Sequence, residues 1–393
     1  MKVLYRAICT LVLLVLLTAC SGKATATEPA PAPTEMQHTA APTEVPVATE
    51  APMEQSHSEP ESDPFKLSVA QLIMDSAGFH EIATALSETQ TIDPEYFTTV
   101  TGVSRILSET VWPAELHDQA HAFIDSLASF AAALEADNVA DAVELSEAVH
   151  DSQHELSHEV EHWLGDAPIS TTEANTFDLS VARQFMDSAG FHEMATALSE
   201  TQTIDPEYIS TVTGVQTILS HTVWPAELND QAQAFIESLA SFAAALEADN
   251  IADAIEISEA VHDAQHELSH EIEHWLGDAQ KDAAESNRFD LSLAQYFMDK
   301  AGFHEIATAL SETQTIDPEF ISTVTGVSAV LSQVVWPSGL NDQAQAFIES
   351  LRVFSAALEA DNIANAVELS ETVHDAQHEL SHAIEHALEG SAH

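Results

Sequence analysis

The stretch VHDSQHELSHEVEHWL, residues 149 to 164, occurs three times in this 393-residue chain. It returns as VHDAQHELSHEIEHWL at 261 to 276 and as VHDAQHELSHAIEHAL at 373 to 388, each copy 112 positions after the last. Val149, Leu156 and Val160 follow the three-and-four spacing of a helix that buries one face. The stretch therefore predicts an amphipathic helix, and its recurrence predicts that the whole fold is built in triplicate.

Histidines recur at every fourth position of this helix, opposite its apolar face. His154 and His158 lie about 160° to either side of Leu156 around the helix, so the row should face solvent. Carboxylates accompany it, and imidazole with carboxylate suits Zn²⁺, Cu²⁺ or Ni²⁺. The predicted metal ligands are His150, His154, His158, His162, Glu147 and Asp151, with His262, His266, His270, His274, His374, His378, His382 and His386 in the later copies.

The N-terminus carries the features of a secretion signal. Lys2 and Arg6 precede an apolar run from 11 to 17, which is too short to span a membrane. The run ends in LTAC, which resembles the lipobox of bacterial lipoproteins and implies that residues 1–19 are removed and that Cys20 carries a lipid anchor. The resemblance implies an extracytoplasmic protein held at the cell membrane.

Residues 20–64 are rich in Pro, Thr, Ala and Glu and hold almost no large apolar side chains, which predicts a disordered tether. The cysteines of the chain are Cys9, inside the predicted signal, and Cys20. The mature protein is therefore expected to have no disulfide and no thiolate metal ligand.

Each repeat is long enough to form its own core, at 65–167, 177–279 and 289–393. In the first, apolar spacing predicts helices over about 67–87 and 114–136, and a helix opened by the capping pair Asp93-Pro94 lies between them. The histidine helix follows, opened at 137 or 138. The expected fold is all-α, with three tandem up-and-down four-helix bundles behind the disordered tether.

This layout, with an EADN turn before a last helix rich in histidine, resembles periplasmic four-helix bundles of the cytochrome b562 type. The resemblance implies haem held between a methionine of the first helix and a histidine of the last. Met74, Met186 and Met298 occupy that helix, but its periodicity places Met74 outside the apolar stripe. No haem ligand is therefore assigned.

The chain is strongly acidic, with 65 Asp and Glu against 10 Lys and Arg and a formal net charge of −55. Such a charge excludes nucleic acid and anionic membrane surfaces as electrostatic partners and favours cations. A simpler reading of the acidity alone is that it keeps an exposed protein soluble.

Two motifs typical of enzymes lie within the histidine row. HELSH at 154–158 fits HExxH of zinc metalloproteases, but those enzymes need a further ligand and an edge strand beside a cleft, which an all-helical repeat does not offer. Glu147 and His150 form an ExxH pair of the di-iron type, but such centres need a second pair facing inward. No enzymatic activity is predicted.

His80, His192 and His304 differ from the row because they lie in the first predicted helix, near its apolar face. They are expected to be partly buried and hydrogen-bonded rather than ligands. His117 and His121 are four apart in the first repeat, but the other repeats replace them with Asn and Gln.

The function predicted from the sequence is binding of a divalent transition metal by each histidine row, as a buffer or delivery site near the membrane, with a metal transporter as a possible partner. The alternative is a pH-responsive or structural interaction scaffold, because imidazoles titrate near pH 6.

Overall fold

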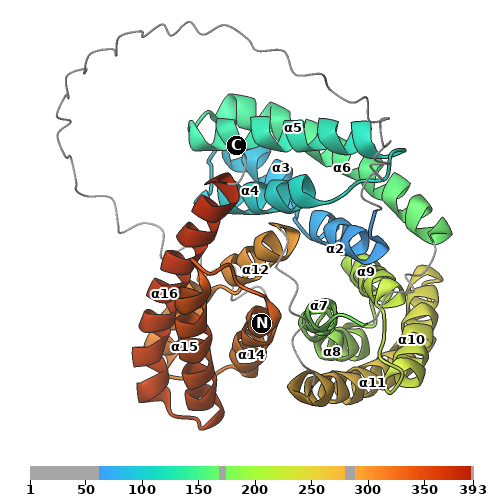
Figure 1. Cartoon of the computed structure of the whole chain (residues 1–393). Coiled ribbons are helices and arrows are strands. Elements are labelled where there is room, and N and C mark those ends of the chain that lie inside the picture. Colours follow the sequence, from blue (N-terminus) through green and yellow to red (C-terminus); the bar gives the residue numbers. More distant parts are fainter. Residues whose placement is uncertain (1–61, 168–173, 279–287, 391–393) are drawn as a thin grey trace, which may run out of the picture. The chain divides into compact units, whose positions relative to one another are not determined.

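The computed structural model describes residues 62–167, 174–278 and 288–390, and within them the regular structure is entirely α-helical. Figure 1 shows these helices coloured along the sequence. The predicted signal, Cys20 and nearly all of the predicted tether lie outside the described residues. The expected all-α class is confirmed.

Each repeat contains the same five helices. The first has α2 (Pro64–Asp75), α3 (Phe79–Thr89), α4 (Pro94–Glu109), α5 (His117–Glu135) and α6 (Val139–Asp166). The second has α7 (Thr176–Ser188), α8 (Phe191–Thr201), α9 (Pro206–His221), α10 (Asn229–Glu247) and α11 (Ile251–Asp278). The third has α12 (Arg288–Lys300), α13 (Phe303–Thr313), α14 (Pro318–Gln333), α15 (Asn341–Glu359) and α16 (Ile363–Gly390).

The single helix predicted over about 67–87 was wrong, because Gly78 interrupts it. Gly78 adopts φ 68°, a left-handed conformation that glycine reaches without steric cost, and separates α2 from α3. Gly190 and Gly302 do the same in the other repeats, at φ 69° and 62°. The predicted start of the next helix is confirmed, since the Asp93 side chain accepts a hydrogen bond from the backbone N–H of Glu95.

Helices α3 to α6 pack mainly within their own repeat, with α5 against both α4 and α6 and α3 against α6. Phe79 at the start of α3 meets Phe123 of α5 edge-on, with ring centroids 6.1 Å apart. The same pair recurs in the second and third repeats at 6.1 and 6.0 Å. This arrangement holds α3 in a fixed position beside the histidine helix α6.

The first helix of each repeat also packs on a neighbouring repeat. Helix α2 lies on α9, α7 on α14 and α12 on α4, so the contacts between repeats run in a cycle. The three contacts use equivalent positions, with Leu72 against Gly214, Gln184 against Gly326 and Tyr296 against Gly102. The glycines allow the helices to approach, since a Cβ at Gly214 or Gly326 would collide with the facing side chain.

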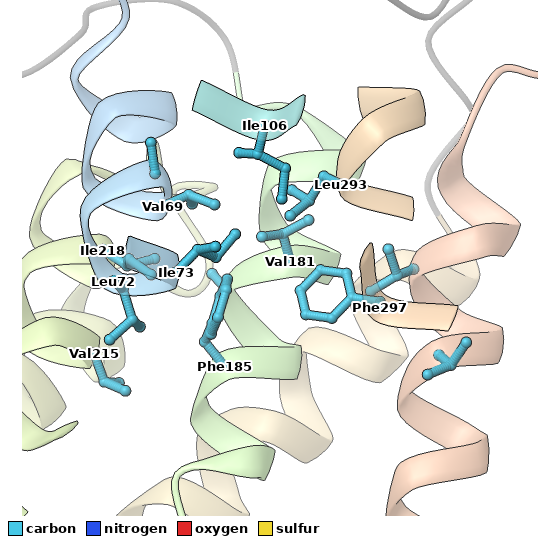
Figure 2. Packing of buried hydrophobic residues seen from close by; sticks show 14 of the residues in the cluster. Val69, Leu72, Ile73, Ile106, Val181, Phe185, Val215, Ile218, Leu293 and Phe297 are labelled. Carbon is cyan, nitrogen blue, oxygen red and sulfur yellow. The ribbon is translucent and has the colours of Figure 1, made fainter. Parts of the chain in front are cut away.

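Apolar residues of these first helices join the repeats into one continuous core. Figure 2 shows the residues at equivalent positions side by side, among them Val69, Val181 and Leu293 and the larger Ile73, Phe185 and Phe297. The rings of Phe185 and Phe297 have centroids 5.3 Å apart. Three separate cores, as the sequence suggested, are therefore replaced by a shared one.

The expectation that Met74 lies outside the core was also wrong. Met74 is 0% exposed, and Met186 and Met298 are 1% exposed. Met74 does not share the helical phase of the residues after Gly78, because the chain changes direction at that glycine. Met74 belongs to α2, and α2 packs against α6 on one side and the next repeat on the other.

A charged cluster lies near the starts of the first helices. Lys66, Asp178 and Asp290 occupy equivalent positions in the three repeats. Lys66 pairs with Asp290 at 3.4 Å. The Oδ1 atom of Asp178 is buried without a hydrogen-bond partner. Burial, with repulsion from Asp63 and Asp290, raises the pKa of Asp178 to about 7, against the attraction of Lys66.

We expect Asp178→Asn to stabilise the protein at pH 8 and to change little near pH 4. An acid whose pKa is higher in the folded state costs stability as pH rises through the interval from 3.8 to about 7. Removing that charge should raise the free energy of unfolding by at most about 4 kcal/mol at pH 8. Urea unfolding at both pH values measures the difference. Asp290→Asn is the control and should have a much smaller effect at pH 8, because it removes a repulsion on Asp178 but also breaks the pair with Lys66. An equal effect of Asp178→Asn at both pH values would contradict the assignment.

Candidate functional site

Two histidines of α6 stand within chelating distance of each other. The Nε2 atoms of His150 and His154 are 3.0 Å apart, because residues four apart share one face of a helix. The separation is again 3.0 Å for His262 with His266 and for His374 with His378. When the two facing Nε2 atoms share a single proton, one imidazole donates and the other, protonated at its Nδ1, accepts, so both rings can be neutral.

A third imidazole comes from α3. The ring centroid of His80 is 5.0 Å from that of His150, and the equivalent distances are 4.9 and 5.2 Å in the other repeats. We call His80, His150 and His154 the histidine cluster. The equivalent clusters are His192, His262 and His266 in the second repeat and His304, His374 and His378 in the third.

The prediction that His80 is partly buried among apolar residues was wrong. His80 is exposed, as are His192 and His304. The break at Gly78 resets the helical phase, so Phe79 takes the buried position at the start of α3 and His80 points toward α6. A signal was present in the sequence, since a glycine directly before the Phe-His pair recurs in all three copies.

A carboxylate of α2 accepts hydrogen bonds from the turn of α6 that carries His154. Asp75 accepts hydrogen bonds from Gln153 Nε2 at 2.5 Å and from Ser157 Oγ at 2.9 Å, both on α6. Asp187 and Asp299 accept from the equivalent Gln and Ser side chains. Burial raises the pKa of Asp75 against these hydrogen bonds, and the charge of His154 favours its ionised form. These hydrogen bonds fix one turn of α6 and place a negative charge near His154.

The central imidazole of each cluster resists protonation. Burial lowers the pKa of His150 from 6.5, and the charges of His154 and His80 lower it further, whereas Asp151 and Glu81 oppose the shift. His262 and His374 show the same shift with the same causes. Only neutral imidazole binds a metal ion. The central histidine of the cluster therefore stays available as a donor at pH values below those at which histidine is ordinarily protonated.

The row stays at the surface beyond His150, as predicted. The cluster member His154 and the remaining His158 and His162 are exposed, and so are Glu147 and Asp151. Ring contacts join His270 with His274 at 4.6 Å and His382 with His386 at 6.2 Å. The structure thus brings together the first two histidines of the row with a third from α3, and it leaves the last two as an outer pair.

Part of the cluster fits a divalent ion such as Zn²⁺, namely the two imidazole nitrogens on the histidine helix. Two nitrogens at about 2.0–2.1 Å from a tetrahedral Zn²⁺ are about 3.3 Å apart, close to the separation of His150 and His154. Within the described ranges, however, no group of three or more His, Cys, Asp or Glu side chains is arranged to hold a metal ion. A complete shell would require rotation of the His80 side chain, and the exposure of His80 leaves room for it.

The enzyme motifs gain no supporting geometry. Glu155 of HELSH and Glu147 of the ExxH pair are exposed on the outer face of α6. The described residues form no strand against which a peptide substrate could align. His117 and His121 have ring centroids 4.3 Å apart and belong to the first repeat alone.

The third cluster lies on a groove that the first repeat helps to form. Its lining combines His304, His374 and His378 with Glu95 and Arg105 of α4. Tyr296 and the half-buried carboxylate of Asp299 also line it. The third cluster therefore differs in surroundings from the other two, although the histidines themselves are equivalent.

Comparison of the chain with protein-family models, with curated proteins and with solved structures gave no match. Among the described helices, none has both the length and the apolar character needed to cross a membrane.

We expect the pKa of His150 to rise toward its ordinary value when either neighbouring imidazole is removed. His80→Gln and His154→Gln each delete a charge that opposes protonation of His150, and His158→Gln, one turn beyond the cluster, is the matched control. Histidine resonances followed by NMR from pH 5 to 8 give the values directly. Equal shifts in all three variants would show that the cluster does not act as a unit.

Proposed function

We propose that the protein binds divalent transition metal ions, such as Zn²⁺, Cu²⁺ or Ni²⁺, at the three histidine clusters. The observation that carries the proposal is the 3.0 Å approach of two Nε2 atoms on the last helix of every repeat, with a third imidazole beside them. Imidazole nitrogen is a preferred donor for these ions. This proposal keeps the predicted ligands His150 and His154 and adds His80.

The fourth coordination position is supplied by water, by Asp151 or by an imidazole of the outer pair. Asp151 lies beside His150, with Oδ1 3.7 Å from Nδ1, and its charge partly opposes the lowering of the His150 pKa. The negative surface raises the local concentration of cations. Because the ligands must lose their protons, the sites release metal as pH falls below about 6.

We further propose that the chain acts outside the cytoplasm, as three tandem helical repeats tethered to the membrane through a lipid on Cys20. The support is the LTAC sequence at the end of the apolar run and the Pro- and Thr-rich composition of residues 20–64. At that place the sites serve as a buffer, or as a delivery site for a membrane metal transporter.

The test is titration of Zn²⁺, Cu²⁺ and Ni²⁺ into the folded chain by calorimetry. We expect one tight site per repeat at pH 7.5 and a loss of affinity of at least about tenfold at pH 5.5, because protons compete for the imidazoles. Replacing His150, His262 and His374 by Ala should abolish tight binding. The matched variant replaces His158, His270 and His382 by Ala and should retain it.

The outcomes separate the two sets of histidines. If both triple variants bind as tightly as the wild type, the histidines are not the site. If only the outer variant loses binding, the metal lies on the row as first predicted and not at the cluster.

A pH-responsive interaction scaffold is the second candidate, favoured by the lowered pKa of the central histidines. A histidine held neutral in the folded state stabilises it above its unfolded pKa, and that stability is lost as pH falls below about 6.5. This function requires a change of conformation or association near pH 6 in the absence of any metal.

A further inference from the structure

Basic side chains are concentrated where the third repeat meets the first. The first repeat continues into the second and the second into the third, whereas the third has no direct link to the first along the chain and meets it mainly where α12 packs on α4. The described residues hold six bases, which are Lys66, Arg105, Arg183, Arg288, Lys300 and Arg352. Four of the six form hydrogen bonds or ion pairs between the third repeat and the first.

Arg288 makes the most directional of these contacts. Its Nε and Nη2 atoms donate to the two carboxylate oxygens of Glu109 at 2.8 and 2.7 Å, a paired geometry specific to arginine with carboxylate. Its Nη1 donates to the backbone oxygen of Leu388 at the end of α16. One side chain thus joins α12, the last helix of its own repeat and α4 of the first repeat.

Further polar contacts flank this pair. Arg105 of α4 bonds Gln295 on α12 and lies 3.3 Å from Glu385 on α16. Lys300 at the end of α12 donates to Thr99 Oγ1 at 3.0 Å, and Lys66 pairs with Asp290. The contacts extend from one end of α12 to the other.

The two joints between consecutive repeats lack this pattern. The positions equivalent to Arg288 are Pro64 and Thr176, neither of which carries a positive charge to pair with a carboxylate. The position of Glu109 becomes His221 in the second repeat, where Nε2 lies 3.3 Å from the backbone oxygen of Leu164. If α12 packed on α9 or α14 instead, the guanidinium of Arg288 would face no carboxylate at the position equivalent to Glu109. The surface of α12 therefore matches α4 and neither of the equivalent helices.

We propose that α12 and α4 are a charge-matched docking pair that closes the three repeats into a cycle within one chain. A short peptide linker keeps each repeat close to the next one along the chain and so favours their contact. The contact of the third repeat with the first has no such linker, and the side chains of α12 and α4 specify it. The interface is head-to-tail, so an open chain exposes two complementary surfaces, and the partner that fits each is the other surface on a second copy of this chain.

The test is a double charge reversal, Arg105→Glu with Arg288→Glu, in the otherwise unchanged chain. We expect a larger radius of gyration, by roughly a tenth or more as a compact unit opens, measured by small-angle X-ray scattering at low concentration. Light scattering should show a mass that rises with protein concentration, as open chains join head to tail. Far-UV circular dichroism checks that the helices remain.

The control is Arg183→Glu with Arg352→Glu, which changes the net charge equally. Both arginines pair within their own repeats, Arg183 with Asp187 and Glu273 and Arg352 with Glu349. Adding Glu109→Arg and Glu385→Arg to the first variant restores opposite charges and should restore a compact monomer. The proposal is overturned if the first variant stays compact and monomeric, or if the control opens equally. Should the first variant lose its helices, failure of the four-site variant to recover a compact monomer also overturns it.

Discussion

The left-handed turn at Gly78, repeated at Gly190 and Gly302, is the constraint on which the rest of the structure depends. It separates a segment that packs both on a neighbouring repeat and on the histidine helix from a second segment that packs on the histidine helix of its own repeat. Glycine makes the turn at little steric cost, whereas a residue with Cβ would be strained there.

The same turn brings both features of functional interest into existence. On one side, it directs α3 so that His80 meets His150, which converts a row of surface histidines into a cluster of three rings. On the other side, it frees α2, α7 and α12 to build the core shared by the repeats. The clusters and the shared core thus both depend on the left-handed glycine turn that recurs in each repeat.

The repeats are equivalent in backbone but not in charge. The cluster histidines are identical in each copy, whereas the positions facing a neighbouring repeat differ, such as Leu72, Gln184 and Tyr296 opposite the three glycines. Identical clusters suit a function that is additive over the repeats. Different joint residues suit an assembly in which each repeat must find one particular neighbour, because charges and shapes that fit one partner exclude the others.

The sequence by itself determined the helical class, the 112-residue period, the cap at Asp93 and the exposure of His154 and His158. These depend on spacing within a few turns, where helix geometry is fixed. Only the tertiary structure decided that Met74 is buried, that His80 is exposed beside His150 and that the repeats share a core. Each of these depends on the direction in which the chain leaves Gly78 and on contacts between residues far apart in sequence, such as Arg288 with Glu109, which no local periodicity encodes.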